Sequence, residues 1–256
     1  MRSISIFALV LAIASPALAG PANSTIGGKK LEEDMVHSGG VGYPSMLYEW
    51  WNKGRKTLDW GLSGELVYGD WGAATTNRVR LGFITVRGGR WVKIGFGVNG
   101  ILRWHLAEKE RPKVTHNIGI LFKPGVLIGG NTGDTFVLGV KGELGVPVSI
   151  DVHERVSVVT GGYVPFTYFI NKTFDDRGLV PLLIRMGVEI KANENVAPWF
   201  FFDLGPGIWF GSGTSDATFA WRLGAGATFW GVLGKNKGTS DSASTASSEP
   251  PGEPIE

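Results

Sequence analysis

The chain contains no cysteine among its 256 residues. This excludes disulfide bonds, thiolate metal sites, cysteine nucleophiles and lipidation at an N-terminal cysteine. The formal net charge is only +2, so there is no electrostatic field of the kind that attracts nucleic acid. Long helical segments with alternating Glu and Lys are also absent. What the chain does have is 39 glycines and 10 tryptophans, and this composition favours one large all-β domain.

The common enzymatic motifs are missing as well. The sequence has no P-loop, no H-E-x-x-H and no G-x-S-x-G. Residues 95–100 match G-x-G-x-x-G, but no helix follows them, so the match does not predict a dinucleotide site. A lipid-directed enzyme would need a nucleophile beside a base, and the best set, His105 with Glu108 and Glu110, lacks a serine. We therefore predict a non-enzymatic protein without a cofactor.

The histidines do not predict a metal site. There are four of them: His37, His105, His116 and His153. His105 and His116 flank one predicted loop, but odd and even positions of a strand face opposite sides. Because a metal needs its ligands on one side, no metal is expected.

The first 19 residues have the three parts of a secretory signal peptide. Arg2 precedes an apolar run from Ile4 to Ile13, and residues 17–19 form a small-residue cleavage site before Gly20. The alternative is a membrane anchor, but the apolar run is shorter than the roughly 20 residues that a spanning helix needs. Residues 1–19 are therefore predicted to be removed on export.

The sequence predicts two other segments to be unstructured. Residues 20–34 are polar and Gly-rich, which predicts a flexible leader. Residues 234–256 are rich in Ser, Pro and Glu with almost no apolar residues, which predicts a disordered tail. Residues 35–233 remain for the folded domain.

The segment from Asp134 to Ile170 shows how that domain is built. Apolar residues such as Phe136 and Val140 occupy the even positions before a short turn at 152–154, and charged residues such as Lys141 occupy odd positions. Only a strand keeps a period of two on one face. The same alternation predicts strands over 35–43, 57–68, 79–87, 91–106, 115–129, 134–151, 156–170, 179–191, 196–211 and 217–233.

Two local predictions lie near the start of this series. Met46, Leu47, Trp50 and Trp51 fall at the spacing of one helical face, which predicts a helix over 45–53. We expect it to pack on the barrel mouth or at an interface, with a binding lid as the alternative, and Trp50 and Trp51 are its candidate contact residues. The second prediction is a hairpin over 79–98 with a two-residue turn at Gly88-Gly89, which would pair Val79 with Val98.

The polar face of these strands decides which side is inside. It combines many glycines with charges of both signs, whereas the other face is bulky and apolar along nearly every strand. Small and paired charged residues suit the crowded lumen of a narrow barrel, and an apolar outer face suits lipid. The candidate lumen-lining residues are Glu65, Arg80, Lys93, Arg103, Lys123, Lys141, Glu143, Arg185, Glu189, Asp203 and Arg222.

The length of the predicted strands also favours a membrane barrel. Many of these strands exceed the roughly 9 to 11 residues that cross a bilayer when tilted, and the strands of soluble proteins average roughly 5 to 6. We predict an all-β fold, a closed antiparallel transmembrane β-barrel of about 10 strands within a range of roughly 8 to 12.

The signal peptide, the long alternating strands, the short turns and the absence of cysteine together resemble bacterial outer-membrane β-barrel proteins. The resemblance covers residues 35–233 and is one of class. It implies a Gram-negative outer-membrane location, with membrane lipid and the barrel-assembly machinery as partners. One departure is that Phe229 and Trp230 are followed by a tail, whereas such proteins often end on an aromatic residue.

Two functions fit the inward charges. A salt-bridge network would hold a filled barrel rigid, and this favours a structural or interaction role. A narrow pore would instead have a slight anion preference, since seven of the candidates are basic and four acidic. The alternatives are a porin-like passive channel for a small solute or ion, and a soluble periplasmic barrel that binds an apolar ligand.

Overall fold

The computed structural model describes residues 21, 23–68, 79–81, 84–86, 94–111, 114–130, 136–170, 176–211 and 215–231. The strands are β1 (Met35–Tyr43), β2 (Ser45–Lys53), β3 (Leu58–Val67), β4 (Val79–Leu81), β5 (Ile84–Val86), β6 (Ile94–Arg111), β7 (Val114–Gly130), β8 (Phe136–His153), β9 (Val156–Phe169), β10 (Asp176–Pro181), β11 (Leu183–Ile190), β12 (Val196–Gly211) and β13 (Ser215–Trp230). The predicted signal peptide and tail lie outside the described residues. None of the described residues forms a helix long and apolar enough to span a membrane.

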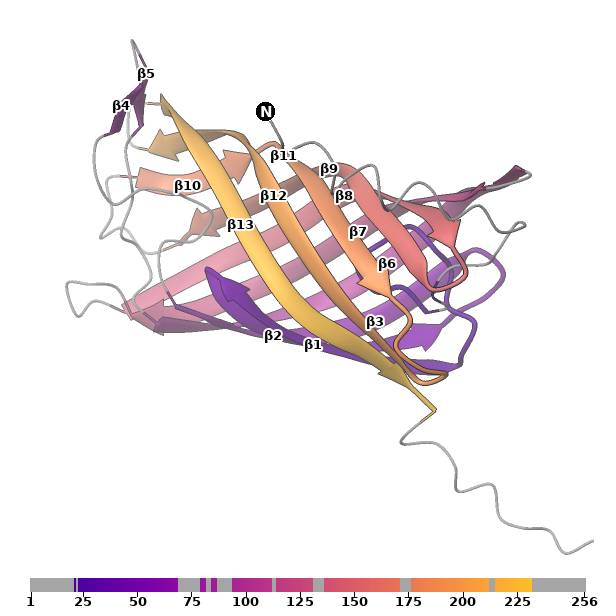
Figure 1. Ribbon diagram of the computed structural model, residues 1–256. Coiled ribbons are helices and arrows are strands. Elements are labelled where there is room, and N and C mark those ends of the chain that lie inside the picture. Colours follow the sequence, from indigo (N-terminus) through magenta and orange to yellow (C-terminus); the bar gives the residue numbers. More distant parts are fainter. Residues whose placement is uncertain are drawn as a thin grey trace, which may run out of the picture.

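Eleven of these strands form one sheet that closes on itself (Figure 1). The last strand, β13, pairs with both β12 and β1, so the sheet has no free end. β10 and β11 both lie between β9 and β12, on either side of Leu182, and share one place in the wall. The barrel therefore has ten strand positions, all antiparallel. The predicted all-β closed barrel of about ten strands is confirmed.

The predicted helix over residues 45–53 is wrong, because these residues form the wall strand β2 between β1 and β3. Trp50 lies on the outer face, edge-on to Trp60 of β3 with ring centroids 5.4 Å apart. Trp51 is fully buried inside the barrel. A strand with aromatic residues on both faces imitates the spacing of an apolar helical face, and this explains the error.

The predicted hairpin over residues 79–98 is also wrong. Val79 pairs with Val86 in a separate two-stranded ribbon, β4–β5, which projects beyond one end of the barrel (Figure 1). Val98 pairs instead with Gly64 of β3 and Val126 of β7. A strand with alternating apolar residues can pair equally well with many other strands of the same pattern. Matching apolar residues across a proposed hairpin therefore does not identify which strand is the true neighbour. The Gly88-Gly89 turn lies outside the described residues.

The two ends of the barrel differ. The chain enters β1 and leaves β13 at the same end, where β8 ends at His153 and β9 begins at Val156. At this end β6 also extends to Arg111, so the predicted charged loop over 107–113 is mostly strand. The opposite end carries the long connection between β3 and β6. Because outer-membrane barrels have short periplasmic turns and longer extracellular loops, the end at which β1 begins and β13 ends is the periplasmic end.

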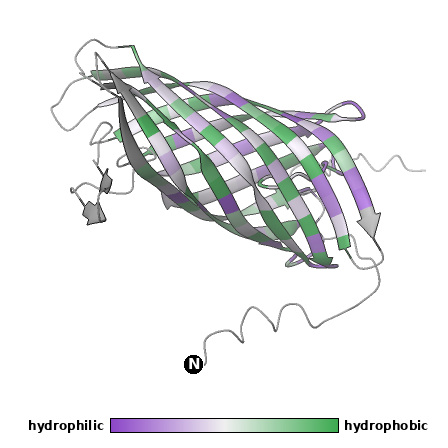
Figure 2. Ribbon diagram, turned by 90° about the horizontal axis from the view of Figure 1, so that it is seen from above, coloured by the Kyte–Doolittle hydropathy of each residue, from purple (hydrophilic) through white to green (hydrophobic). Residues whose placement is uncertain are grey.

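The outer face of the barrel is apolar. Hydrophobic and hydrophilic residues alternate along the strands (Figure 2), and the hydrophobic ones on the outside form cross-strand pairs such as Val140 with Tyr168 and Leu144 with Val164. Phe96, Ile184 and Phe200 are also among the many large apolar side chains exposed there. An apolar band of this extent on a closed barrel is the surface that lipid covers.

Ile184 tests this orientation, because its side chain is 61% exposed on β11. Ile184→Lys is expected to destabilise the barrel in vesicles by roughly 2 to 4 kcal/mol, the cost of a lysine near the bilayer midplane. Leu106→Lys, at the periplasmic end of β6 and equally exposed, should cost roughly 0 to 1 kcal/mol. Guanidinium unfolding in lipid vesicles measures both, and equal costs would contradict a lipid-facing Ile184.

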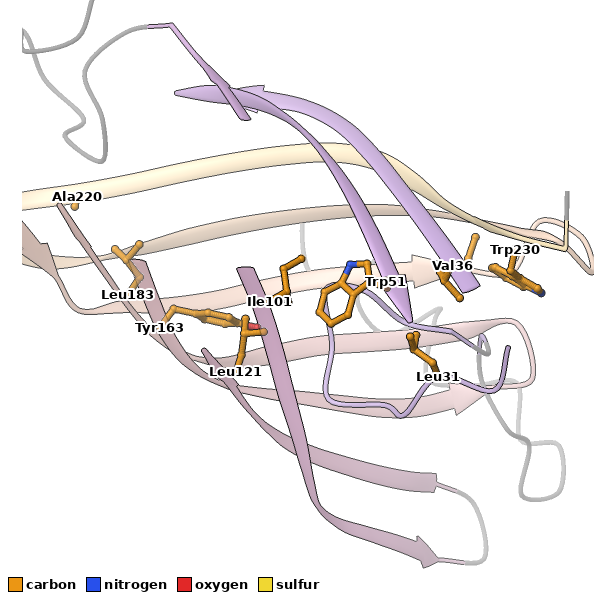
Figure 3. Packing of buried hydrophobic residues seen from close by; sticks show 10 residues of the cluster. Leu31, Val36, Trp51, Ile101, Leu121, Tyr163, Leu183, Ala220 and Trp230 are labelled. Carbon is orange, nitrogen blue, oxygen red and sulfur yellow. The ribbon is translucent and has the colours of Figure 1, made fainter. Parts of the chain in front are cut away.

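The inside of the barrel also contains apolar side chains. Trp51, Val36 and Trp230 belong to one buried cluster with Tyr163 and Leu183 (Figure 3). Leu31, from the segment before β1, belongs to the same cluster and is buried. The lumen is therefore a packed core over part of its length.

Candidate functional site

The segment that precedes β1 lies inside the barrel. Residues 23–29 and Leu31 are buried, so the predicted flexible leader is wrong for this part of residues 20–34. Asn23 Oδ1 accepts hydrogen bonds from the backbone N–H groups of Glu32 and Glu33 at 2.7 and 2.8 Å. These bonds fold the segment back into the lumen from the periplasmic end. We call residues 23–31 the plug segment.

Charged wall residues hold the plug segment. Arg103 Nη1 on β6 donates to the carbonyl oxygens of Ser24 and Gly27 at 2.6 and 3.0 Å, while its Nη2 donates to Asp59 of β3 at 2.9 Å. Asp59 also accepts the backbone N–H of Leu31 at 3.2 Å. Each of these two wall charges is paired with the other and bonded to the plug backbone, which offsets the cost of burying it.

Further contacts come from the opposite wall. Lys29 Nζ lies 3.3 Å from Asp151 Oδ2 of β8, and Tyr163 Oη of β9 donates to the Ile26 carbonyl at 3.2 Å. Thr25 Oγ1 lies 2.9 Å from Thr228 Oγ1 of β13. The plug segment is thus bound from several sides and fills the periplasmic half of the lumen.

Gly28 allows the plug segment to approach the wall closely. A Cβ atom on Gly28 would lie 2.5 Å from the Pro147 carbonyl oxygen and 2.6 Å from that of Asn117. The Gly28 N–H itself donates to Ser149 Oγ at 3.0 Å. A side chain at this position cannot be accommodated without moving backbone.

Gly28→Leu is therefore expected to displace the plug segment, since overpacking of this kind costs roughly 1 to 3 kcal/mol. Trypsin should then cut after Lys29, which is buried in the wild type, about tenfold faster in the folded barrel. Gly130→Leu is the control, because a Cβ there meets nothing within 4 Å. Equal cleavage rates in all three proteins would contradict a bound plug.

The second group of charges lies further along the lumen. Arg185 of β11 binds both carboxylate oxygens of Asp203 of β12 at 2.8 Å, and Arg222 Nε of β13 donates to the same carboxylate at 2.5 Å. Arg222 also bonds Glu143 of β8. The Arg185 guanidinium lies 4.0 Å from the Tyr163 ring centroid. This network ties four strands together across the lumen.

Two more ion pairs face this network. Lys123 Nζ of β7 lies 2.6 Å from Glu49 Oε1 of β2, and Lys141 of β8 bonds Glu65 of β3. Trp51 Nε1 donates to the other Glu49 oxygen at 2.9 Å. These pairs and the Arg185–Asp203–Arg222 network surround a cavity of about 110 Å³, at one side of which lie Thr25 and Ile26 of the plug segment.

The structure brings nine of the eleven predicted lumen residues together inside the barrel: Glu65, Arg103, Lys123, Lys141, Glu143, Arg185, Glu189, Asp203 and Arg222. Arg80 lies on β4, outside the wall, which corrects its assignment. Lys93 lies outside the described residues. Glu49, Asp59 and Asp151 also line the lumen but were not among the predicted residues. Strand parity alone could have found Asp59 and Asp151, whereas Glu49 was hidden in the predicted helix.

The lumen offers no metal site in the part of the chain that the structure describes, where no three His, Asp or Glu residues gather suitably. His105 Nε2 lies 2.7 Å from Asp59 Oδ2, and its Nδ1 lies 3.1 Å from the Gly28 carbonyl oxygen. His105 therefore contacts the plug segment from inside the barrel.

Comparison with known proteins adds little beyond the fold. No protein-family model matches the chain, and no curated protein matches it. Among solved structures, the chain is similar to "Outer-membrane expressed OmpT of Vibrio cholerae" with 14% identity and a TM-score of 0.33, over 77% of this chain and 62% of that one. It is also similar to "OmpT (in-vitro folded), an outer membrane protein of Vibrio cholerae" with 12% identity and a TM-score of 0.31, over 78% and 62%. The chain therefore spans less than two thirds of the length of these structures.

The class of the protein follows from its own architecture. A closed antiparallel barrel carries an apolar band outside and paired charges inside. The chain is an outer-membrane β-barrel. Its location is the bacterial outer membrane, since that apolar band requires lipid around it.

Proposed function

We propose that this protein is a non-conducting outer-membrane barrel with a structural or interaction role in the cell envelope. The observation that supports this is the plug segment, whose backbone is hydrogen-bonded to Arg103 and Asp59 inside the lumen. Ions would have to displace a segment whose backbone is bonded to the buried charges of Arg103 and Asp59, which is costly.

Two features support a filled barrel over a porin-like passive channel. The periplasmic half holds the plug segment, and the remaining cavity of about 110 Å³ has space for only a few water molecules. The soluble periplasmic barrel that binds an apolar ligand is disfavoured, because the large apolar side chains face outward. Membrane lipid and the barrel-assembly machinery remain the proposed partners, and a non-enzymatic role is part of the proposal.

Single-channel recording on the refolded full-length mature protein in planar bilayers tests this function. With insertion confirmed by protease protection, the bilayer should stay silent. Regular conductance steps from the intact chain would overturn the proposal and favour the porin-like channel.

A further inference from the structure

Among the strands that the structure describes, pairing in the barrel wall is interrupted beside the β1–β2 turn. β1 and β2 pair only as far as Gly40 and Leu47. Beyond this point Tyr43 pairs with β13 and Ser45 pairs with β3, so β1 and β2 no longer pair with each other. The Tyr68 hydroxyl donates to the Gly42 carbonyl beside this opening. On the other side, residues 215–222 of β13 pair with β12 but not with β1. We call the gap at residues 41–46 the notch.

An outer groove meets the lumen cavity at the notch. The groove has a volume of about 580 Å³, and its lining includes Gly39, Tyr48, Gly64, Phe96 and Ala225. Gly40, Val41, Leu47 and Glu65 line both the groove and the lumen cavity. The charged interior and the membrane-facing surface are therefore adjacent at the notch.

The groove is suited to hydrocarbon. Gly39, Gly64 and Ala225 leave it deep, and Tyr48 and Phe96 stand exposed on either side. Because it lies in the apolar band of the barrel, the molecules that reach it are lipids.

The lumen side of the notch is suited to an anionic group. The Lys141–Glu65 ion pair lies there, since Glu65 lines both spaces. Arg222 also lines the cavity, and its Nη2 atom is buried without a hydrogen-bond partner, although Nε and Nη1 are bonded to Asp203 and Glu143. A buried guanidinium donor without an acceptor is costly, and an oxyanion would satisfy it.

We propose that the notch binds a single-chain anionic lipid from the membrane. Its acyl chain lies in the outer groove, and its carboxylate or phosphate group passes between β1 and β2 towards Arg222. A cavity of about 110 Å³ accommodates such a group but not a glycan. This site does not depend on whether the lumen conducts, because the plug segment stays in place.

Gly39→Leu and Gly64→Leu fill the groove without disturbing the wall. A Cβ atom on Gly39 lies 3.8 Å from the Tyr48 ring, and one on Gly64 lies 3.9 Å from the Phe96 ring, which are ordinary contacts. Gly162→Leu is the matched control, since it adds the same side chain to β9 where nothing lies within 4 Å. Heat-modifiable migration in gels verifies that all three fold.

The experiment is photocrosslinking of the full-length protein in neutral-detergent micelles with a fatty acid that carries a diazirine at the chain end. Mass spectrometry should place the adducts on residues 39–48, 64–66, 96 and 225. Labelling there should fall about tenfold in Gly39→Leu and Gly64→Leu, as expected for loss of a binding pocket, and stay unchanged in Gly162→Leu. A probe with the diazirine beside the carboxylate should label Tyr43 and Trp199, which line the lumen cavity.

Several results would overturn the proposal. Labelling spread evenly over all lipid-facing strands would show ordinary lipid contact, and equal labelling by a fatty alcohol of the same length would exclude an anionic site. Suppression by excess inorganic phosphate would show that the polar site takes free anions rather than lipid. Adducts between two copies of the chain at the groove would identify a protein interface instead.

Discussion

Deletion of residues 21–31 is expected to turn a silent barrel into a conducting one. The plug segment occupies the periplasmic half of the lumen, where Leu31 packs in the cluster of Trp51 and Trp230 and Arg103 holds the Ser24 and Gly27 carbonyls. Removing it vacates the space beside the remaining cavity, and we expect water to fill the lumen from the periplasmic end. Planar-bilayer recording should then show unitary steps that the intact chain lacks.

The open form should prefer cations. The described lumen residues comprise five basic side chains (Arg103, Lys123, Lys141, Arg185 and Arg222) and seven acidic ones (Glu49, Asp59, Glu65, Glu143, Asp151, Glu189 and Asp203). Among the described residues this balance reverses the slight anion preference expected from the sequence, because Arg80 lies outside the wall, Lys93 is not described and three acidic residues are added. The reversal potential in a KCl gradient measures the preference, since rings of acidic side chains favour cations.

A synthetic peptide of residues 20–34 provides the control for the deletion. Added from the periplasmic side, it should close the pores, because the contacts of the plug segment are made by its own backbone and by Lys29. The same peptide with Gly28→Leu should close them poorly. A deletion variant that folds and inserts but stays silent would show that other residues block the lumen.

Asp203→Ala should be the most destabilising single substitution of the lumen. Asp203 is fully buried and accepts three hydrogen bonds from Arg185 and Arg222. Without it Arg185 keeps only a 3.4 Å contact to the Ile26 carbonyl and its aromatic neighbours. Removing one partner from a buried charge network costs roughly 3 to 5 kcal/mol, because the remaining charges stay desolvated.

Guanidinium unfolding in lipid vesicles measures this loss. Glu154→Ala, in the exposed turn between β8 and β9, should change the free energy of unfolding by less than about 0.5 kcal/mol. Adding Arg185→Met to Asp203→Ala should recover part of the loss, since it removes an uncompensated charge. A cost below about 1 kcal/mol for Asp203→Ala would mean that water reaches the network and screens it.

The strands that could be predicted most directly from the sequence are those with a polar inner face and an apolar outer face. β8 carries Lys141, Glu143 and Ser149 on its inner face and apolar residues such as Val140 and Leu144 outside, and the strand predicted over 134–151 is observed as Phe136–His153. β2 carries Trp51 inside and Trp50 outside, so the period of two is hidden and a helix is predicted. Alternating apolar and polar residues indicate a strand most clearly where its two faces differ in chemistry.

The plug segment could not be predicted for a different reason. Its Ser, Asn, Thr and Gly residues have the composition of a flexible linker, and only the arrangement of Arg103, Asp59 and Asp151 around it makes burial favourable. That arrangement is a property of the closed barrel and is absent from any local stretch of sequence. The charged residues were found because strand parity gives their face, but their partners come from strands far apart in the chain.

The contact between Thr25 and Thr228 joins residues 203 positions apart, and Thr25 also contacts Ser38 of β1. These two partners lie on either side of the junction at which the first and last strands meet. Barrel closure and the final docking of the N-terminal segment are therefore completed by the same late-synthesised strand. A chain truncated before β13 would lack the closing strand and the Thr228 contact, so the N-terminal segment reaches its full set of contacts only after the last strand has been synthesised.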